Sequence, residues 1–258
     1  MKLSGSEIII ESLKKEGVNY IFGYPGGAVL HIYDALFAAK DIKHVLVRHE
    51  QGATHAADGY ARACNKPGVV LVTSGPGITN CVTGIATAHM DSIPMIVISG
   101  QVSRQYVGSD AFQEADATGI TRPICKHNFL INDRESIADT FRKAFIIATT
   151  GRPGPVIIDI PKDLTDPKIK IDFEYKKNIK IRSYKVKTNE DELKIEQAAK
   201  IICNAKKPMI YTGGGVILSK ASKELIKLTK LLGYPITNTL MGLGCLLYTS
   251  DAADELTS

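Results

Sequence analysis

Short apolar runs of strand length alternate with segments of helical pattern from Ser4 to Asp163. This alternation is typical of repeated β/α units, in which helices connect parallel strands and cover both faces of the sheet. The pattern therefore predicts an α/β fold with a doubly wound parallel sheet of about six strands. The expected strands are Val18–Phe22, Ile42–Val47, Val69–Ser74, Pro94–Ser99, Ile124–Ile131 and Pro155–Ile160, and the expected helices are Ala28–Ala39, Gln51–Cys64, Ile78–Ala88 and Arg134–Thr149.

The start of the chain carries a helix signal. Ser4 and Glu7 have the spacing of a capping box in front of apolar residues at helical spacing, and Gly17 suits the position after a helix end. Met1 to Ser6 lead directly into this pattern and lack the apolar core of a signal peptide. We therefore expect a helix between Ser4 and Gly17, and a cytoplasmic protein.

A lysine-rich stretch follows the first β/α series. Lys168 to Lys187 contain eight Lys or Arg residues and two acids, enough to account for the net charge of +5 of the whole chain. A charge run of this kind is more often solvated than bound to nucleic acid. We predict a linker here and no nucleic-acid partner. We also predict no membrane span, since no run approaches about 18 apolar residues.

A second, shorter β/α series follows the linker, with too few strands for an independent sheet domain. Its expected elements are a helix at Asp191–Asn204, a strand at Pro208–Thr212, a helix at Lys220–Leu232 and a strand at Ile236–Leu240. The last residues do not continue the pattern and resemble translated adaptor sequence. The predicted organisation is a first domain over 1–165, a linker over 166–190, part of a second α/β domain over 191–244, and an artefactual tail over 245–258.

The metal-binding residue types show no ligand spacing. The five cysteines are scattered, odd in number and without a CxxC pair, which argues against a zinc site or a disulfide framework. His49 and His55 flank Glu50, but they are six positions apart, whereas a zinc-protease helix needs two histidines four apart. We expect no metal ligands in this chain.

Glycine-rich turns follow several expected strands. The segments Gly23–Ala28, Ser74–Gly77 and Gly213–Gly215 could let the backbone approach a ligand closely, but ordinary turns have the same composition. Glu50 follows the expected second strand, at the carboxyl edge where open parallel sheets bind ligands. The residues alone leave open whether Glu50 is a functional carboxylate or an acid favoured by the dipole of a helix's first turn.

Taken together, a series of motifs resembles, in order, the catalytic subunit of acetolactate synthase, also called acetohydroxyacid synthase. The resemblance covers about residues 4 to 244. The motifs are FGYPGGA (22–28), RHEQGA (48–53), DGYARA (58–63), TSGPGITN (73–80), SDAFQEAD (109–116), GRPGPVIIDIPKD (151–163) and NTLMGLG (238–244).

The resemblance implies that the first domain binds the pyrimidine half of thiamine diphosphate. In that family a glutamate hydrogen-bonds the pyrimidine nitrogen, and Glu50 matches it. By sharing a proton with the ring, this carboxyl favours the imino tautomer that removes the thiazolium C2 proton. Other matching residues are Tyr24, Gly26, Gly27 and Ala28 in the loop that lines the cofactor, Phe112 and Gln113 facing the reacting keto acid, with Gln113 taken as catalytic, and Lys162 near the substrate channel.

The resemblance also implies a flavin-binding second domain, in which FAD is mainly structural. The family holds Mg²⁺ and the diphosphate with a GDG…NN motif in a third domain, and this sequence has no such motif. Ser103 stands where the family commonly has proline, at the rim where inhibitors bind, which puts inhibitor sensitivity in doubt. The matching FAD residues are Arg152, Gly213, Gly214, Gly215, Thr239, Leu240 and Met241.

The implied reaction is decarboxylation of pyruvate and transfer of its two-carbon unit to a second 2-keto acid in branched-chain amino acid synthesis. The products would be 2-acetolactate or 2-aceto-2-hydroxybutyrate, and the implied partners are a second catalytic subunit and a small regulatory subunit. Without the metal motif, we expect the chain alone to be inactive. Pyruvate oxidase, glyoxylate carboligase and flavin-free catabolic acetolactate synthase remain alternatives, as does a non-catalytic truncated module; Phe112–Asp116 and the triple glycine favour the FAD-containing biosynthetic form.

Overall fold

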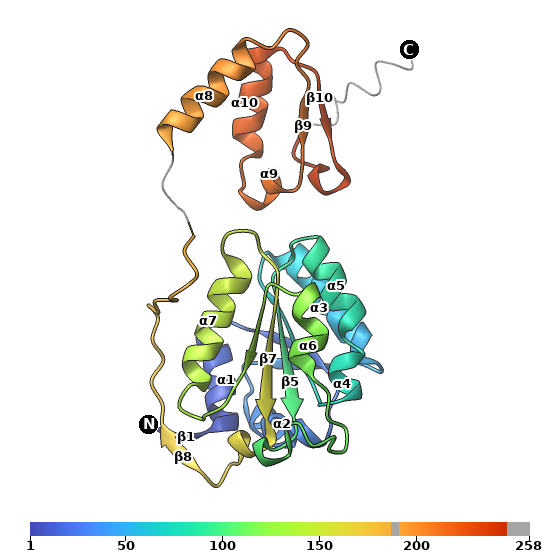
Figure 1. The fold of residues 1–258 in the computed structure, drawn as a ribbon, viewed down its shortest axis with the longest axis vertical. Coiled ribbons are helices and arrows are strands. Elements are labelled where there is room, and N and C mark those ends of the chain that lie inside the picture. The colour runs from blue at the N-terminus through green and yellow to red at the C-terminus, as the bar shows by residue number, and fades with distance from the viewer. Residues whose placement is uncertain (187–190, 247–258) are drawn as a thin grey trace. The chain divides into compact units, whose positions relative to one another are not determined.

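The computed structural model of the chain describes residues 1–186 and 191–246 and divides it into two compact units (Figure 1). The first unit precedes the interval 187–190 and the second follows it. Each unit forms its own parallel sheet, so each is described by itself.

A six-stranded parallel sheet forms the centre of the first unit. Its strand order is β3-β2-β4-β5-β7-β6, which confirms the predicted doubly wound parallel sheet. Every residue of the central strands β4, β5 and β7 is buried, as expected where helices cover both faces. The strands are β2 (Tyr20–Gly23), β3 (Lys43–Leu46), β4 (Gly68–Val72), β5 (Met95–Gln101), β6 (His127–Leu130) and β7 (Pro155–Pro161).

Helices cover the two faces of this sheet and enclose two apolar cores. Successive strand residues alternate between these cores: Ile157 belongs to one and Ile158 to the other. Helices α1 (Gly5–Lys15), α2 (Leu30–Ala38) and α7 (Ile137–Thr149) pack against the first face. Helices α3 (Glu50–Cys64), α5 (Val82–Met90) and α6 (Ala117–Thr121) lie on the second face (Figure 1).

The predicted capping box begins α1. The backbone N–H of Ser4 donates to Glu7 Oε2 at 2.7 Å, and the backbone N–H of Glu7 donates to Ser4 Oγ at 3.3 Å. The hydrogen bond from Ser4 holds the pKa of the Glu7 carboxyl below its usual value. Gly17 follows the helix with φ of 73°, a left-handed conformation that glycine adopts at no steric cost.

Several predicted elements differ in extent. The helix expected over 78–88 is two helices, α4 (Pro76–Thr79) and α5, because the chain turns at Asn80 and Cys81. A 3-10 turn, η1 (Gly27–Val29), precedes α2, and another, η3 (Arg122–Ile124), delays the start of β6. These turns place loop residues where the apolar pattern alone suggested regular helix or strand.

The interval predicted as a linker packs onto the first unit as far as Val186. Strand β8 (Lys170–Asp172) pairs antiparallel with β1 (Lys2–Ser4), a pairing that the sequence analysis missed. Beyond β8, Phe173, Tyr175, Ile181 and Tyr184 pack against the first core. Charged residues alternate with apolar ones over much of this interval, so the lysines face solvent while the apolar side chains that pack on the core are half-buried. Residues 187–190 of the predicted linker lie outside the described residues.

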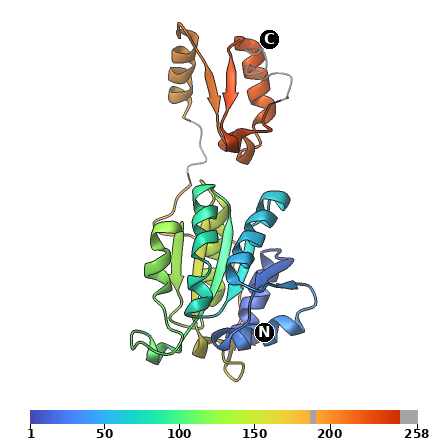
Figure 2. The ribbon, with the colours of Figure 1, turned by 90° about the vertical axis from the view of Figure 1, so that its right-hand side faces the viewer.

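The second unit has a small parallel sheet of β9 (Ile210–Thr212) and β10 (Ile236–Asn238). Figure 2 shows these two strands side by side in orange. Cys245, predicted to begin an unpacked tail, is 1% exposed, and its thiol donates to Asn238 Oδ1 at 3.3 Å. The rest of that predicted tail, from residue 247, lies outside the described residues. The helices are α8 (Glu192–Cys203), α9 (Gly215–Leu218) and α10 (Ser222–Leu232), and the turn η5 (Leu240–Gly242) follows β10.

No helix within residues 1–186 and 191–246 is long and apolar enough to cross a membrane.

Candidate active site

The carboxyl ends of the parallel strands bring most of the predicted site residues to one edge of the first unit. β2 ends before the turn that holds Gly26, and β3 ends shortly before Glu50. β5 ends at Gln101, which pairs with Pro161, and Lys162 follows directly. Open parallel sheets bind ligands at this edge, so the strand register explains why residues distant in sequence can share one site.

Glu50 is the first residue of α3 and is 9% exposed. The preceding His49 caps the helix, since its Nδ1 accepts the backbone N–H of Gln51 at 3.1 Å. The side-chain amide of Asn80 donates to Glu50 Oε2 at 2.9 Å. Both sequence interpretations therefore have a structural basis: Glu50 lies in a helix's first turn and is also a buried carboxyl at the carboxyl edge of the sheet.

The ionisable neighbours of Glu50 favour their neutral forms. Burial, with the charge of Glu50, raises the pKa of the Tyr33 hydroxyl and of the Cys81 thiol well above their ordinary values. Burial lowers the pKa of His44, whose Nε2 lies 3.3 Å from the Tyr33 hydroxyl. The direct donor to the Glu50 carboxyl is the side-chain amide of Asn80.

The Gly23–Ala28 turn packs tightly on the end of β4. A Cβ at Gly26 would lie 2.5 Å from Cβ of Thr73, so no larger residue fits without displacing one of the two segments. The Thr73 hydroxyl also accepts the backbone N–H of Ala28 at 3.3 Å. Tyr24 is 42% exposed, and no atom lies within 4 Å of a Cβ at Gly27. The turn is therefore fixed to β4 on one side and open on the other.

A second close approach joins the loop after β4 to the loop that carries Phe112 and Gln113. A Cβ at Gly75 would lie 2.4 Å from the backbone oxygen of Gln113, and Gly75 has φ of 57°. Gly75 caps the helix α4, which leads to Asn80 and so to Glu50. Helix α4 therefore has a close contact with Gln113 at its start, and it is followed by Asn80, which binds Glu50. Phe112 is 87% exposed.

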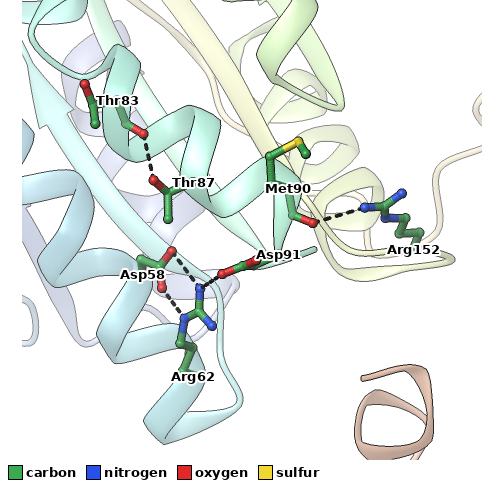
Figure 3. A network of polar contacts seen from close by, with 7 residues as sticks. All are labelled: Asp58, Arg62, Thr83, Thr87, Met90, Asp91 and Arg152. Carbon is green, nitrogen blue, oxygen red and sulfur yellow. Dashed lines mark hydrogen bonds and ion pairs between the residues drawn. The ribbon is translucent and has the colours of Figure 1, made fainter. Parts of the chain in front are cut away.

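Arg152 lies at the opposite end of the sheet, where the parallel strands begin. It lies just before β7, and its guanidinium donates to Ser92 Oγ at 2.7 Å. It also donates to the carbonyl of Met90 at 3.2 Å (Figure 3). Arg62 lies at the same end of α5, where it donates to Asp58 and, at 2.6 Å, to Asp91 (Figure 3). The structure therefore separates Arg152 from Glu50 and the other predicted residues of the first unit.

The predicted flavin residues of the second unit gather at the carboxyl ends of β9 and β10. A Cβ at Gly214 would lie 3.1 Å from Cβ of Met241, and a Cβ at Gly213 would lie 3.7 Å from the Thr239 hydroxyl. Within the part of the chain that the structure describes, no atom lies within 4 Å of a Cβ at Gly215, and Leu240 is 82% exposed. Two glycine-containing turns thus face each other at this edge, with the backbone of one close to the side chains of the other.

Two domain families match the chain. The family "Thiamine pyrophosphate enzyme, N-terminal TPP binding domain" matches residues 3–120. The family "Thiamine pyrophosphate enzyme, central domain" matches residues 195–253, which extends into the interval predicted to be a tail. The chain belongs to the thiamine pyrophosphate enzymes. The family resemblance inferred from the motifs is thereby confirmed.

Several curated relatives of this chain are named acetolactate synthase large subunits. The chain is 54% identical to that of Haemophilus influenzae and 57% identical to that of Buchnera aphidicola subsp. Schizaphis graminum, in each case over 94% of the chain and 42% of the relative. It is 54% identical to the probable acetolactate synthase large subunit of Methanocaldococcus jannaschii, over 94% of the chain and 41% of the relative. The chain therefore spans less than half the length of these relatives.

The residues of this chain fit parts of the implied cofactors. Buried Glu50 offers a carboxyl at the ligand-binding edge, and Gly26 and Gly75 keep two turns too close to their neighbours for a side chain. At the facing turns, Gly214 is half-buried and Met241 is 37% exposed, and glycine lets the backbone there approach a phosphate or ribityl chain. Among residues 1–186 and 191–246, no group of three or more His, Cys, Asp or Glu side chains could hold a metal ion.

Sequence reasoning missed three residues that shape the site. Asn80 was placed inside a continuous helix, whereas the break after α4 turns its amide to Glu50. Thr73 and Tyr33 were not singled out, although Thr73 holds the Ala28 turn and Tyr33 borders the carboxyl. Thr73 and Asn80 had a usable signal, because they begin and end the TSGPGITN motif.

Proposed function

We propose that this chain forms the pyrimidine-binding domain and part of the flavin-binding domain of an acetolactate synthase. The proposed reaction joins pyruvate to a second 2-keto acid and gives 2-acetolactate or 2-aceto-2-hydroxybutyrate for branched-chain amino acid synthesis. The observation that carries the proposal is buried Glu50, held by Asn80 at the carboxyl edge of the sheet and preceded by the motif residues Arg48 and His49. The names of the curated relatives support the choice of reaction.

When bound, thiamine diphosphate supplies an acidic carbon that becomes the nucleophile toward the keto acid. The proposed task of Glu50 is to hold a proton on a pyrimidine nitrogen, since the carboxyl is buried where the strands end and ligands bind. Asn80 orients the Glu50 carboxyl through its amide hydrogen bond. One oxygen of Glu50 is thereby fixed by the protein, and the carboxyl can present its other oxygen to the ring.

The remaining site residues take proposed roles from their positions. The turn from Tyr24 to Ala28 would line the cofactor, because it is open on the side away from Thr73. Phe112, Gln113 and Lys162 would meet the keto acid, since their loops leave the same edge of the sheet. Exposed Phe112 presents an apolar ring suited to the small alkyl group of such an acid.

FAD is proposed to bind the Gly213–Gly215 turn together with Thr239, Leu240 and Met241. Arg152, which lies where the strands of the first unit begin, keeps the FAD contact proposed from the motifs. Mg²⁺ would be held by residues outside this chain. The proposed partners are a second catalytic subunit and a small regulatory subunit, and the proposed location is the cytoplasm.

The test replaces Glu50 with Gln in a hybrid that joins residues 1–244 to the C-terminal part of the Haemophilus influenzae relative. The amide is nearly isosteric, so the variant should bind thiamine diphosphate, but it cannot pass a proton to the ring. Exchange of the C2 proton for deuterium, followed by NMR after acid quench, should slow by on the order of 10² to 10⁴.

Glu11→Gln is the matched control, because Glu11 lies on α1 and pairs with Lys14 at 2.9 Å, away from the sheet edge. Its exchange rate and acetolactate formation should equal those of the parent hybrid. Equal exchange in the Glu50 variant and the parent would show that Glu50 is only a helix-start carboxyl. A folded parent hybrid that forms no acetolactate from pyruvate would refute the proposed reaction.

A further inference from the structure

The loop that carries Phe112 and Gln113 is closed at its base by a single side chain. Gln101 ends β5, and its Oε1 accepts the backbone N–H of Val102 at 2.8 Å. Its Nε2 donates to the backbone carbonyl of Ala115 at 2.9 Å. One amide therefore joins the first and last residues of the 102–115 loop. Gln101 itself is 4% exposed, so solvent competes little for these bonds.

Asp159 fixes the orientation of that amide. The Nε2 of Gln101 also donates to Asp159 Oδ2 at 3.0 Å. If the amide were flipped, its oxygen would face the Ala115 carbonyl and the carboxyl, and its nitrogen would face the Val102 N–H. All of these pairings are unfavourable. The Ala115 carbonyl, the Val102 N–H and the carboxyl therefore act together to hold Gln101 in the orientation that closes the loop.

Asp159 is a buried carboxyl to which the proposed chemistry assigns no role. It lies near the end of β7 and is 3% exposed, and its Oδ1 has no hydrogen-bond partner among residues 1–186 and 191–246. Burial raises its pKa to about 7, the charge of Asp116 acts in the same direction, and the hydrogen bond from Gln101 and the nearby hydroxyl of Ser99 act against it. Ser99 and Gln101 reach it from β5, and Asp116 from the start of α6. A costly buried acid of this kind needs a compensating role or partner.

The rest of the loop is braced to itself and to neighbouring segments, which include the Asn132 carbonyl that accepts from Arg104 at 2.8 Å. The Glu114 carboxylate accepts backbone N–H groups from Gly108 and, at 2.9 Å, from Ala111. Arg104 donates to Asp163 Oδ2 at 2.7 Å, just beyond Lys162. The bonds of Glu114 hold the shape of the loop, whereas Gln101 holds its two ends on the sheet.

We propose that Asp159 and Gln101 form a clamp that positions the 102–115 loop, which makes Asp159 a positioning residue for Phe112 and Gln113. The clamp itself follows from the hydrogen bonds above. Its consequence for substrate rests on the proposed function. Because the clamp acts on backbone groups, breaking it should loosen the loop without unfolding the sheet.

The test measures backbone hydrogen exchange of the full 258-residue chain by mass spectrometry. Asp159→Leu and Gln101→Met remove the clamp while keeping apolar volume, and Asp159→Asn keeps an oxygen acceptor for the Gln101 amide. In the first two variants, peptides within 102–115 should exchange about tenfold faster, and in Asp159→Asn at the wild-type rate. Peptides from β4 and α7 should not change in any variant.

Thr121→Val is the matched control, because Thr121 is a fully buried polar residue on α6 whose hydroxyl donates to Ala117 and does not touch the loop. It should leave loop exchange unchanged. Unchanged loop exchange in folded Gln101→Met, or equally faster exchange of loop and β4, would overturn the clamp. If Asp159→Leu fails to fold, the other two variants still test the clamp. The clamp requires faster loop exchange in Gln101→Met and the wild-type rate in Asp159→Asn.

The exchange experiment needs no catalysis, so it stands or fails independently of the proposed reaction. In the hybrid enzyme, the same variants add a functional readout. Loosening the loop should raise KM for the keto acid about tenfold with a smaller effect on kcat, and Asp159→Asn should restore KM. Faster loop exchange with unchanged KM would retain the clamp and refute its link to substrate.

Discussion

Replacing Asp159 with Asn should remove a pH-dependent cost from the stability of the first unit. Burial raises the pKa of this carboxyl from 3.8 to about 7. Between these two values the folded chain binds a proton that the unfolded chain has released, so the free energy of unfolding falls as pH rises. The loss is complete above about pH 7 and absent below about pH 4. An Asn at this position does not titrate, and this part of the pH dependence should disappear.

The size of the effect follows from the shift. A difference of about three pKa units corresponds to on the order of 4 kcal/mol over the whole range. Between pH 5 and pH 8, where most of the change occurs, the expected loss in the wild-type chain is about 2–3 kcal/mol. The new amide also places N–H groups where Oδ1 had no partner, at a cost of about 1–3 kcal/mol that is independent of pH. Wild type and Asp159→Asn are therefore compared by the change in their free energy of unfolding between pH 5 and pH 8, not by its value at one pH.

Urea unfolding followed by far-ultraviolet circular dichroism at pH 5 and pH 8 measures this change. Asp163→Asn is the control. Although burial acts to raise its pKa, hydrogen bonds from Arg104 hold the Asp163 carboxyl below its usual range. The Asp163 carboxyl is ionised in the folded and the unfolded chain between pH 5 and pH 8. Asp163→Asn should therefore show the wild-type change in the free energy of unfolding over this pH range. Parallel stability curves for wild type and Asp159→Asn would refute the reasoning, because they would show that Asp159 is ionised in the folded chain.

Two further substitutions test local features of the first unit by urea unfolding. Ser4→Ala should lower its stability by about 1 kcal/mol, since it removes the Oγ acceptor at the start of α1; an unchanged midpoint would mean that the capping box is not formed in solution. Gly75→Ala should cost more than about 2 kcal/mol, because it combines a left-handed backbone with a contact to Gln113, whereas Gly17→Ala has open space and should cost about 1 kcal/mol. Equal losses at the two glycines would contradict the close approach of the loops.

The sequence predicted the regular elements where the signal is local. Ser4 and Glu7 specify a helix start within one turn, and the buried run of β4 specifies a strand within five residues. The prediction failed where the same local pattern fits two structures. The apolar spacing around Asn80 suits one continuous helix as well as two helices with a break, and the lysines of 168–187 conceal alternating residues that pair β8 with β1. A pairing partner near the other end of the unit gives no local signal.

The candidate site likewise combines residues that the sequence identified with contacts that only the tertiary structure shows. The motifs identified Glu50 and Gln113 before any geometry, and their chemical roles remain predictions. The contacts that hold such residues were decided by the tertiary structure: Asn80 binds Glu50 from 30 positions away, and Gln101 binds Asp159 from 58 positions away.

By itself, the sequence determined the parallel α/β architecture, the helix caps and the family of this chain. Periodicity and capping act between residues a few positions apart, and a motif can be read without knowing its neighbours. Only the tertiary structure decided that Arg152 lies at the opposite edge from Glu50, and that a buried acid on β7 orients the amide closing the 102–115 loop. Strand order and register set these relations, because they determine which strand ends meet at one edge.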